Sequence, residues 1–83
     1  MQVGKRVDRP DDSLFESGEY GKISNGDWYC CPPDSDLIGN LAGHEVVEHE
    51  DGTITVYPSI LINARHKGQE WHGFLERGVW REV

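Results

Sequence analysis

The feature that most constrains the fold is a glycine-bearing turn near the middle of the 83-residue chain. Asp51 and Gly52 fit the two central positions of a type I′ turn, which joins antiparallel strands tightly. The segments on either side, 46–49 and 54–57, alternate between apolar and polar residues. The sequence therefore predicts a β-hairpin with one apolar face. A two-residue turn pairs His49 with Ile54, Glu48 with Thr55, Val47 with Val56 and Val46 with Tyr57, which puts Val47, Ile54 and Val56 on that face.

Two further turn signals predict two further hairpins. Asn25-Gly26 tolerates positive φ and is typical of a two-residue turn, here between strands over 20–24 and 27–31. Near the C-terminus, the loop Glu76-Arg77-Gly78 joins strands over 71–75 and 79–83. We expect Gly78 to take the left-handed position of this three-residue loop.

The remaining segments complete an all-β prediction. Residues 59–62 (Ser-Ile-Leu-Ile) are typical of a short, fully buried strand, and Pro58 ends the strand before it or begins a bulge. Residues 63–70 are polar and predict a loop. We therefore expect an all-β domain, a small antiparallel sheet or sandwich of about five to six short strands built from three hairpins.

The first nineteen residues carry weaker signals. Val3 and Val7 are isolated apolar positions among charges, and Pro10 begins a turn or cap sequence. A short helix over 12–16 has too few residues to persist without packing. We predict a weakly structured lead-in over 1–19 and a single β domain over 20–83, in line with a length that allows one domain.

The placement of charge excludes one class of function. The net charge is −7, and no lysine or arginine occurs from Ile23 to Ala64, a span that holds seven acidic residues. A protein that binds DNA or RNA through phosphate contacts needs the opposite sign, so direct nucleic-acid binding through this span is not expected.

The acid-only span has two interpretations. It either serves solubility or forms an acidic surface complementary to a basic groove on another protein, in the manner of a nucleic-acid mimic. On the second interpretation the partner is a protein with a basic surface. The candidate partner-binding residues are Asp34, Asp36, Glu45, Glu48, Glu50 and Asp51.

Cysteines and histidines raise the question of a metal. Thiolate and imidazole are suitable zinc ligands, but the chain has no Cys-x₂-Cys spacing. Adjacent cysteines also make no disulfide framework, which favours reduced thiols. We predict no cofactor, with zinc as the alternative. The residues considered are Cys30, Cys31, His44, His49, His66 and His72.

No enzyme is expected either. A cysteine nucleophile needs a histidine base and an orienting carboxylate, and no motif here supplies that arrangement. Trp28, Trp71 and Trp80 are the largest apolar groups, and a domain this small needs them for its core. The alternative for one of them is an exposed anchor for a partner. No apolar run reaches the ~18 residues of a membrane span, and no secretory signal begins the chain. A cytoplasmic location is the expectation.

Two longer sequence segments resemble those of a known family. TVYPSILI, followed by WHGFLERGVW, is similar to an uncharacterised family of small phage and prophage proteins, some of them labelled ammonia monooxygenase. The resemblance covers roughly residues 17–83. The positions that carry it are Trp28-Tyr29-Cys30-Cys31, Pro58-Ser59-Ile60, His72, Gly78 and Trp80.

The resemblance implies a phage or prophage accessory protein that acts by protein contact in the bacterial host cytoplasm. Some relatives are Cys-rich in the first strand and carry another Cys just before the histidine, which suits zinc. Here Pro32-Pro33 follows the cysteines and Gln69 stands near the later position. A zinc-binding domain using Cys30 or Cys31 with His72 is one alternative. A structural protein that forms homo-oligomers through an exposed edge strand is another.

Overall fold

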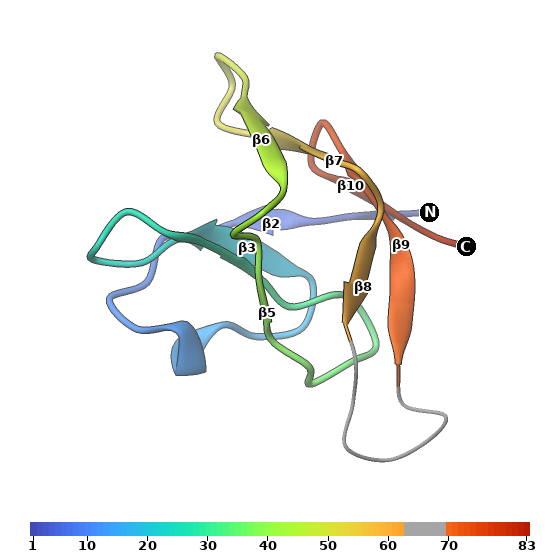
Figure 1. Ribbon diagram of the computed structural model, residues 1–83, viewed down its shortest axis with the longest axis horizontal. Helices are drawn as coiled ribbons and strands as arrows, with labels where there is room; N and C mark the ends of the chain where they lie inside the picture. The colour runs from blue at the N-terminus through green and yellow to red at the C-terminus, as the bar shows by residue number, and fades with distance from the viewer. Residues whose placement is uncertain (63–69) are drawn as a thin grey trace.

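The computed structural model describes residues 1–62 and 70–83, and in these ranges the chain is built of short strands in three small sheets (Figure 1). The predicted all-β fold is confirmed. The described ranges hold ten strands rather than five or six, because several pairings involve only two residues on each strand. The described residues contain no helix that is long and apolar enough to cross a membrane.

Two sheets have four strands each. The first has the order β1-β10-β9-β8, with every pairing antiparallel. Its strands are β1 (Gln2–Val3), β10 (Val79–Glu82), β9 (Trp71–Glu76) and β8 (Ile60–Ile62). The second has the order β2-β3-β4-β5, with β2 parallel to β3 and the other pairs antiparallel. Its strands are β2 (Lys5–Arg6), β3 (Glu19–Lys22), β4 (Trp28–Cys30) and β5 (Gly39–Asn40).

The third sheet is the central hairpin, which projects from the other two in Figure 1. It consists of β6 (Glu45–Glu48) and β7 (Ile54–Tyr57). All three predicted hairpins are therefore present, as β3–β4, β6–β7 and β9–β10.

The predicted register of the central hairpin is wrong by one residue. Val46 lies opposite Val56 and Glu48 lies opposite Ile54. Val47 therefore shares a face with Thr55, and not with Ile54 and Val56 as predicted. The loop has three residues, and Gly52 takes φ +87° at its end. The cause is Asp51, whose carboxylate accepts hydrogen bonds from the Thr53 N–H (3.0 Å) and hydroxyl (2.6 Å) and closes an Asx turn.

The other two turns also differ from prediction by one residue. In β3–β4, Asn25 accepts the Asp27 N–H at 2.9 Å and makes a three-residue loop instead of a two-residue turn. In β9–β10 the loop is one residue shorter than predicted, because Glu76 pairs with Val79. Arg77 and Gly78 alone form the turn with φ +46° and +76°, as in type I′.

The first nineteen residues are more ordered than the sequence indicates. β1 extends the first sheet and β2 extends the second, so the N-terminal segment joins the two. Gly4 lies between them and donates its N–H to the Gly78 carbonyl at 2.7 Å. A turn of 3-10 helix, η1 (Asp12–Leu14), follows, and the Asp11 side chain caps it by accepting the Ser13 N–H.

The core lies where the sheets meet around Trp80, which is 1% exposed. Its ring makes edge-to-face contacts with Trp71, at 5.4 Å between centroids, and with Tyr20, at 6.4 Å. Two of the three tryptophans are therefore core residues, as expected. Trp28 is half-buried, with Arg6 and Lys22 over its ring.

β8 corrects the prediction of a fully buried strand. Ile60 and Ile62 are buried, but Leu61 between them is 57% exposed. The reason is that successive side chains of a strand point to opposite faces, and Leu61 lies on the face opposite to Ile60 and Ile62. Of the polar loop predicted over 63–70, residues 63–69 lie outside the described residues.

Candidate functional site

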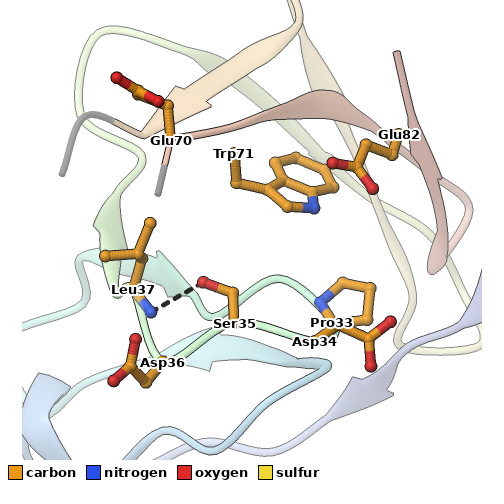
Figure 2. Close-up of a pocket in the computed structure, with 8 residues that line it drawn as sticks. All are labelled: Pro33, Asp34, Ser35, Asp36, Leu37, Glu70, Trp71 and Glu82. Atoms are coloured by element: carbon orange, nitrogen blue, oxygen red, sulfur yellow. Dashed lines mark hydrogen bonds between the residues drawn. The ribbon is translucent and has the colours of Figure 1, made fainter. Parts of the chain in front are cut away.

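A pocket of about 320 Å³ between the β4–β5 connection and the β9–β10 pair is lined by four acidic residues. Figure 2 shows Trp71 above the hollow, with Asp34 and Glu82 on one side and Asp36 and Leu37 on the other. The residues that line the pocket are Pro33, Asp34, Ser35, Asp36, Leu37, Glu70, Trp71 and Glu82.

The local sequence explains how the floor of this pocket forms. Pro32 and Pro33 follow β4, and neither can donate a hydrogen bond to a neighbouring strand. Asp34 then takes φ +57°, which turns the chain. Ser35 holds the turn, because its hydroxyl oxygen accepts the Leu37 N–H at 2.9 Å.

The opposite wall is Trp71, and a glycine makes room for it. A Cβ on Gly73 would lie 2.5 Å from the outer edge of the Trp71 ring and 2.9 Å from the Cα of Glu82. Because Gly73 has no side chain, the indole can lie against the β9–β10 pair beside Glu82. The wall of the pocket therefore depends on a close approach that glycine permits.

The pocket is strongly acidic. Four carboxylates line it, and no lysine or arginine is among the described residues that do so. Asp34, Asp36 and Glu82 are all exposed. The one described side-chain hydrogen bond to this trio is from the Gln2 amide to Asp34, at 3.4 Å.

Trp71 adds a hydrogen-bond donor to this acidic rim. The residue is 4% exposed, yet Figure 2 shows its ring nitrogen on the edge that faces the hollow. Among the described residues nothing accepts a hydrogen bond from this nitrogen, whereas Nε1 of Trp80 donates to the Gly18 carbonyl at 3.0 Å. The two buried indoles therefore differ in hydrogen bonding within the described part of the chain.

The six predicted partner-binding acids do not form one surface. Asp34 and Asp36 line this pocket, while Glu48, Glu50 and Asp51 lie at the tip of the β6–β7 hairpin beside His49 and Arg77. Glu45 is exposed on β6, opposite Tyr57. No described residue lines both the pocket around Trp71 and the hollow at the hairpin tip.

The hairpin tip is electrostatically compensated. Glu48 pairs with Arg6 at 3.0 Å and with Lys22 at 3.8 Å. The Thr53 hydroxyl and N–H, which bond Asp51, lower the pKa of that carboxyl below its ordinary value. Arg77 contributes a further positive charge to the tip. The tip therefore offers less free negative charge than the pocket.

The described residues considered for zinc are not gathered into one cluster. Cys30 and Cys31 are 0% and 1% exposed, and burial, with the neighbouring Cys31, raises the pKa of Cys30 to about 12. A zinc ligand must be the thiolate, which this environment disfavours. The described residues contain no group of three potential ligands.

The histidines have other partners. Nε2 of His72, exposed on β9, lies 3.0 Å from the Ser59 hydroxyl. His44 bonds the Ser59 carbonyl at 3.2 Å and His49 bonds the buried Thr55 hydroxyl at 2.7 Å. His66 lies outside the described residues.

Sequence reasoning missed Trp71, Glu70 and Glu82 as site residues. Glu70 and Glu82 lie beyond the acid-only span, and the sequence favours the core for Trp71, as for each tryptophan, over a role as a partner anchor. The pairing of Gly73 with Glu82 would have pointed to these residues. That pairing follows only from the correct register of the last hairpin, which the sequence did not predict.

Comparisons of the chain with protein families, with curated proteins and with solved structures found no match.

Proposed function

We propose that this protein is a non-enzymatic accessory protein that binds a partner with a basic surface through the pocket around Trp71. The observation that carries the proposal is the set of exposed carboxylates, Asp34, Asp36 and Glu82, in a hollow with no basic residue among its described lining. A concave surface lined by one sign of charge focuses the field and accelerates encounter with the opposite charge.

The surroundings of the described cysteines and of the Ser59–His72 pair favour binding over nucleophilic catalysis. Both cysteines are enclosed, and burial raises the pKa of each thiol. The Ser59–His72 pair lies at the surface, and no carboxylate among the described residues bonds the His72 ring to orient it. Nucleophilic catalysis of the serine or cysteine type needs that third group.

The family resemblance suggests where such a partner is found. In a phage or prophage context, the partner is a host or phage protein in the bacterial cytoplasm, and the carboxylates take the place of nucleic-acid phosphates in its basic groove. The chain itself, with net charge −7, does not bind nucleic acid.

Two charge-matched double variants test the site. Asp34→Asn with Asp36→Asn removes two pocket charges, and asparagine tolerates the left-handed backbone of Asp34. Glu50→Gln with Asp51→Asn removes two charges from the hairpin tip and keeps an acceptor for Thr53. Binding of a fluorescein-labelled Lys/Arg-rich peptide, followed by anisotropy, should weaken about tenfold in the first variant and little in the second.

Salt and competition complete this test. Binding should weaken strongly between about 0.1 and 1 M salt, as the Debye length falls from about 10 to 3 Å. A partner captured by the wild type but not by the pocket variant should be released by duplex DNA. Equal loss of peptide binding in the two double variants would contradict a pocket-specific function.

The open edge of β8 favours a second candidate, a homo-oligomer. Leu61 is 57% exposed on this edge strand, and unpaired strand edges favour association with another chain. Light scattering after size exclusion should then show a multimer that Leu61→Lys converts to a monomer. A monomeric wild type at high concentration would exclude this candidate.

A further inference from the structure

We infer that the pocket is a receptor for one arginine side chain within an extended segment of the partner, with the Trp71 N–H bound to a main-chain carbonyl of that segment. This inference rests on the proposed function and specifies its ligand. It combines two independent observations, the carboxylate rim and the unpartnered indole donor.

The arrangement of the rim favours a guanidinium group. Figure 2 places Asp34 and Glu82 on one side of the hollow and Asp36 on the other. A planar guanidinium has five N–H donors in a fixed fork and can bond carboxylates on two sides, whereas an ammonium is a compact point charge. Glu70 also lines the pocket, but the inference does not depend on it.

The walls favour the same group. Pro33, Leu37 and Trp71 give the hollow apolar surfaces. Guanidinium is more weakly hydrated than ammonium and stacks on flat apolar and aromatic groups, so entering such a hollow costs it less solvation.

Trp71 requires something that a cation cannot supply. Its side chain is buried, and its Nε1–H faces the hollow with no acceptor among the described residues. The nitrogen itself reaches solvent, so a ligand that displaces water from it loses a hydrogen bond unless it offers an acceptor beside its cation. A peptide does so, because every residue carries a main-chain carbonyl.

The space around the pocket accommodates a chain rather than an isolated ion. A second hollow of about 160 Å³ shares Pro33, Asp34, Trp71 and Glu82 with the first. It continues toward Met1, Gln2 and Trp80. An extended segment can therefore place one side chain in the larger hollow while its neighbouring residue occupies the smaller one.

The test compares three blocked pentapeptides that differ only at the central residue, which is arginine, lysine or citrulline. The full-length protein is labelled with ¹⁵N, and its indole N–H signals are followed by NMR. We expect the arginine peptide to shift the Trp71 signal most and the Trp80 signal less, because the Trp80 N–H already donates to Gly18. Citrulline keeps the shape of arginine but has no charge. The affinity of the citrulline peptide should therefore be lower than that of the arginine peptide by a factor of about ten or more.

Variants assign the effect to the site. Trp71→Phe identifies the Trp71 signal and should weaken arginine-peptide binding. Because Trp71 is a core residue, Asp34→Asn with Asp36→Asn serves as a second variant that leaves the core intact and should also abolish the shift.

The outcomes separate this inference from the proposed function. Lysine and arginine peptides that bind the pocket equally well overturn the arginine receptor and leave the proposed basic partner in place. Basic peptides that bind only elsewhere on the protein overturn both. No shift of any signal with millimolar peptide at low salt overturns both.

Discussion

At the scale of single residues, the most enclosed ion pair of the described chain joins Arg9 and Glu19. The Glu19 side chain is only 7% exposed, and Nη2 of Arg9 lies 3.0 and 2.8 Å from its two carboxylate oxygens. The Glu16 N–H also donates to it, at 2.9 Å. Burial by itself raises the pKa of Glu19, but these donors more than offset it and lower the pKa below its ordinary value.

This ion pair predicts acid sensitivity. A carboxyl with a lower pKa in the folded state contributes stability above its unfolded value of about 4.5, and that stability is lost as pH falls through the folded pKa. Urea unfolding as a function of pH should show the free energy of unfolding falling below about pH 4.5. In Glu19→Gln this fall should be shallower, and an unchanged slope would contradict the assignment.

A pair of arginine variants measures the same interaction at neutral pH. Arg9→Met leaves the buried Glu19 charge unpaired and should cost about 1–3 kcal/mol of unfolding free energy. Arg81→Met breaks the exposed pair with Glu76, at 2.9 Å, and should cost less than about 1 kcal/mol. Equal costs would show that burial of Glu19 adds nothing.

The cysteines give a second prediction at this scale. Because Cys30 and Cys31 are enclosed and burial raises the pKa of both, neither presents a reactive thiolate. A colorimetric thiol reagent at pH 8 should react with neither cysteine in the folded protein and with both in denaturant. Rapid reaction of either cysteine in the folded protein would contradict this prediction and favour the metal or nucleophile interpretation.

At the scale of strands and turns, local sequence predicts where the chain reverses but not the register that follows. The three glycine-bearing turns are all present, because positive φ is costly for other residues. Asp51 and Asn25 add hydrogen bonds of their own, which lengthen two of the loops by a residue. Each one-residue shift exchanges the faces of a strand, so the predicted apolar face of the central hairpin was wrong.

The N-terminal strands were not predictable for a different reason. β1 and β2 pair through their backbones, while Val3 is 86% exposed and Lys5 is also exposed. No alternation of apolar and polar residues therefore marks them. Gly21 permits the approach, because a Cβ there would overlap the Val7 carbonyl oxygen.

Two glycines that both have positive φ distinguish the free-energy cost of turn strain from the cost of crowding in the core. Gly52 has φ +87° and open space around it, so Gly52→Ala should cost about 1–2 kcal/mol for the backbone alone. Gly78 has φ +76°, but a Cβ there would lie 2.6 Å from the Tyr20 hydroxyl and 3.0 Å from Thr53. Thermal unfolding should show Gly78→Ala as the more damaging change, by about a further 1–3 kcal/mol. Equal effects would show that the turn does not press on the core.

At the scale of the whole molecule, charge is divided between places of different character. The hairpin tip is tied to the second sheet, where Arg6 and Lys22 bond Glu48 and lie over Trp28. Asp34, Asp36 and Glu82 of the pocket beside the first sheet are exposed and have no lysine or arginine partner among the described residues. The acid-only span pointed to Asp34 and Asp36, but the fold alone brings Trp71 and Glu82 to them. Charge counts along a chain do not show which charges are already paired.

The central claim is that a basic partner binds at the Trp71 pocket, and a backbone chemical-shift map tests it most directly. Titration of the ¹⁵N-labelled protein with a Lys/Arg-rich peptide at low salt should shift the amides of Ser35, Asp36, Leu37, Trp71 and Glu82 most. Shifts that are largest over residues 49–52, at the hairpin tip, with the pocket amides unmoved, would contradict the account.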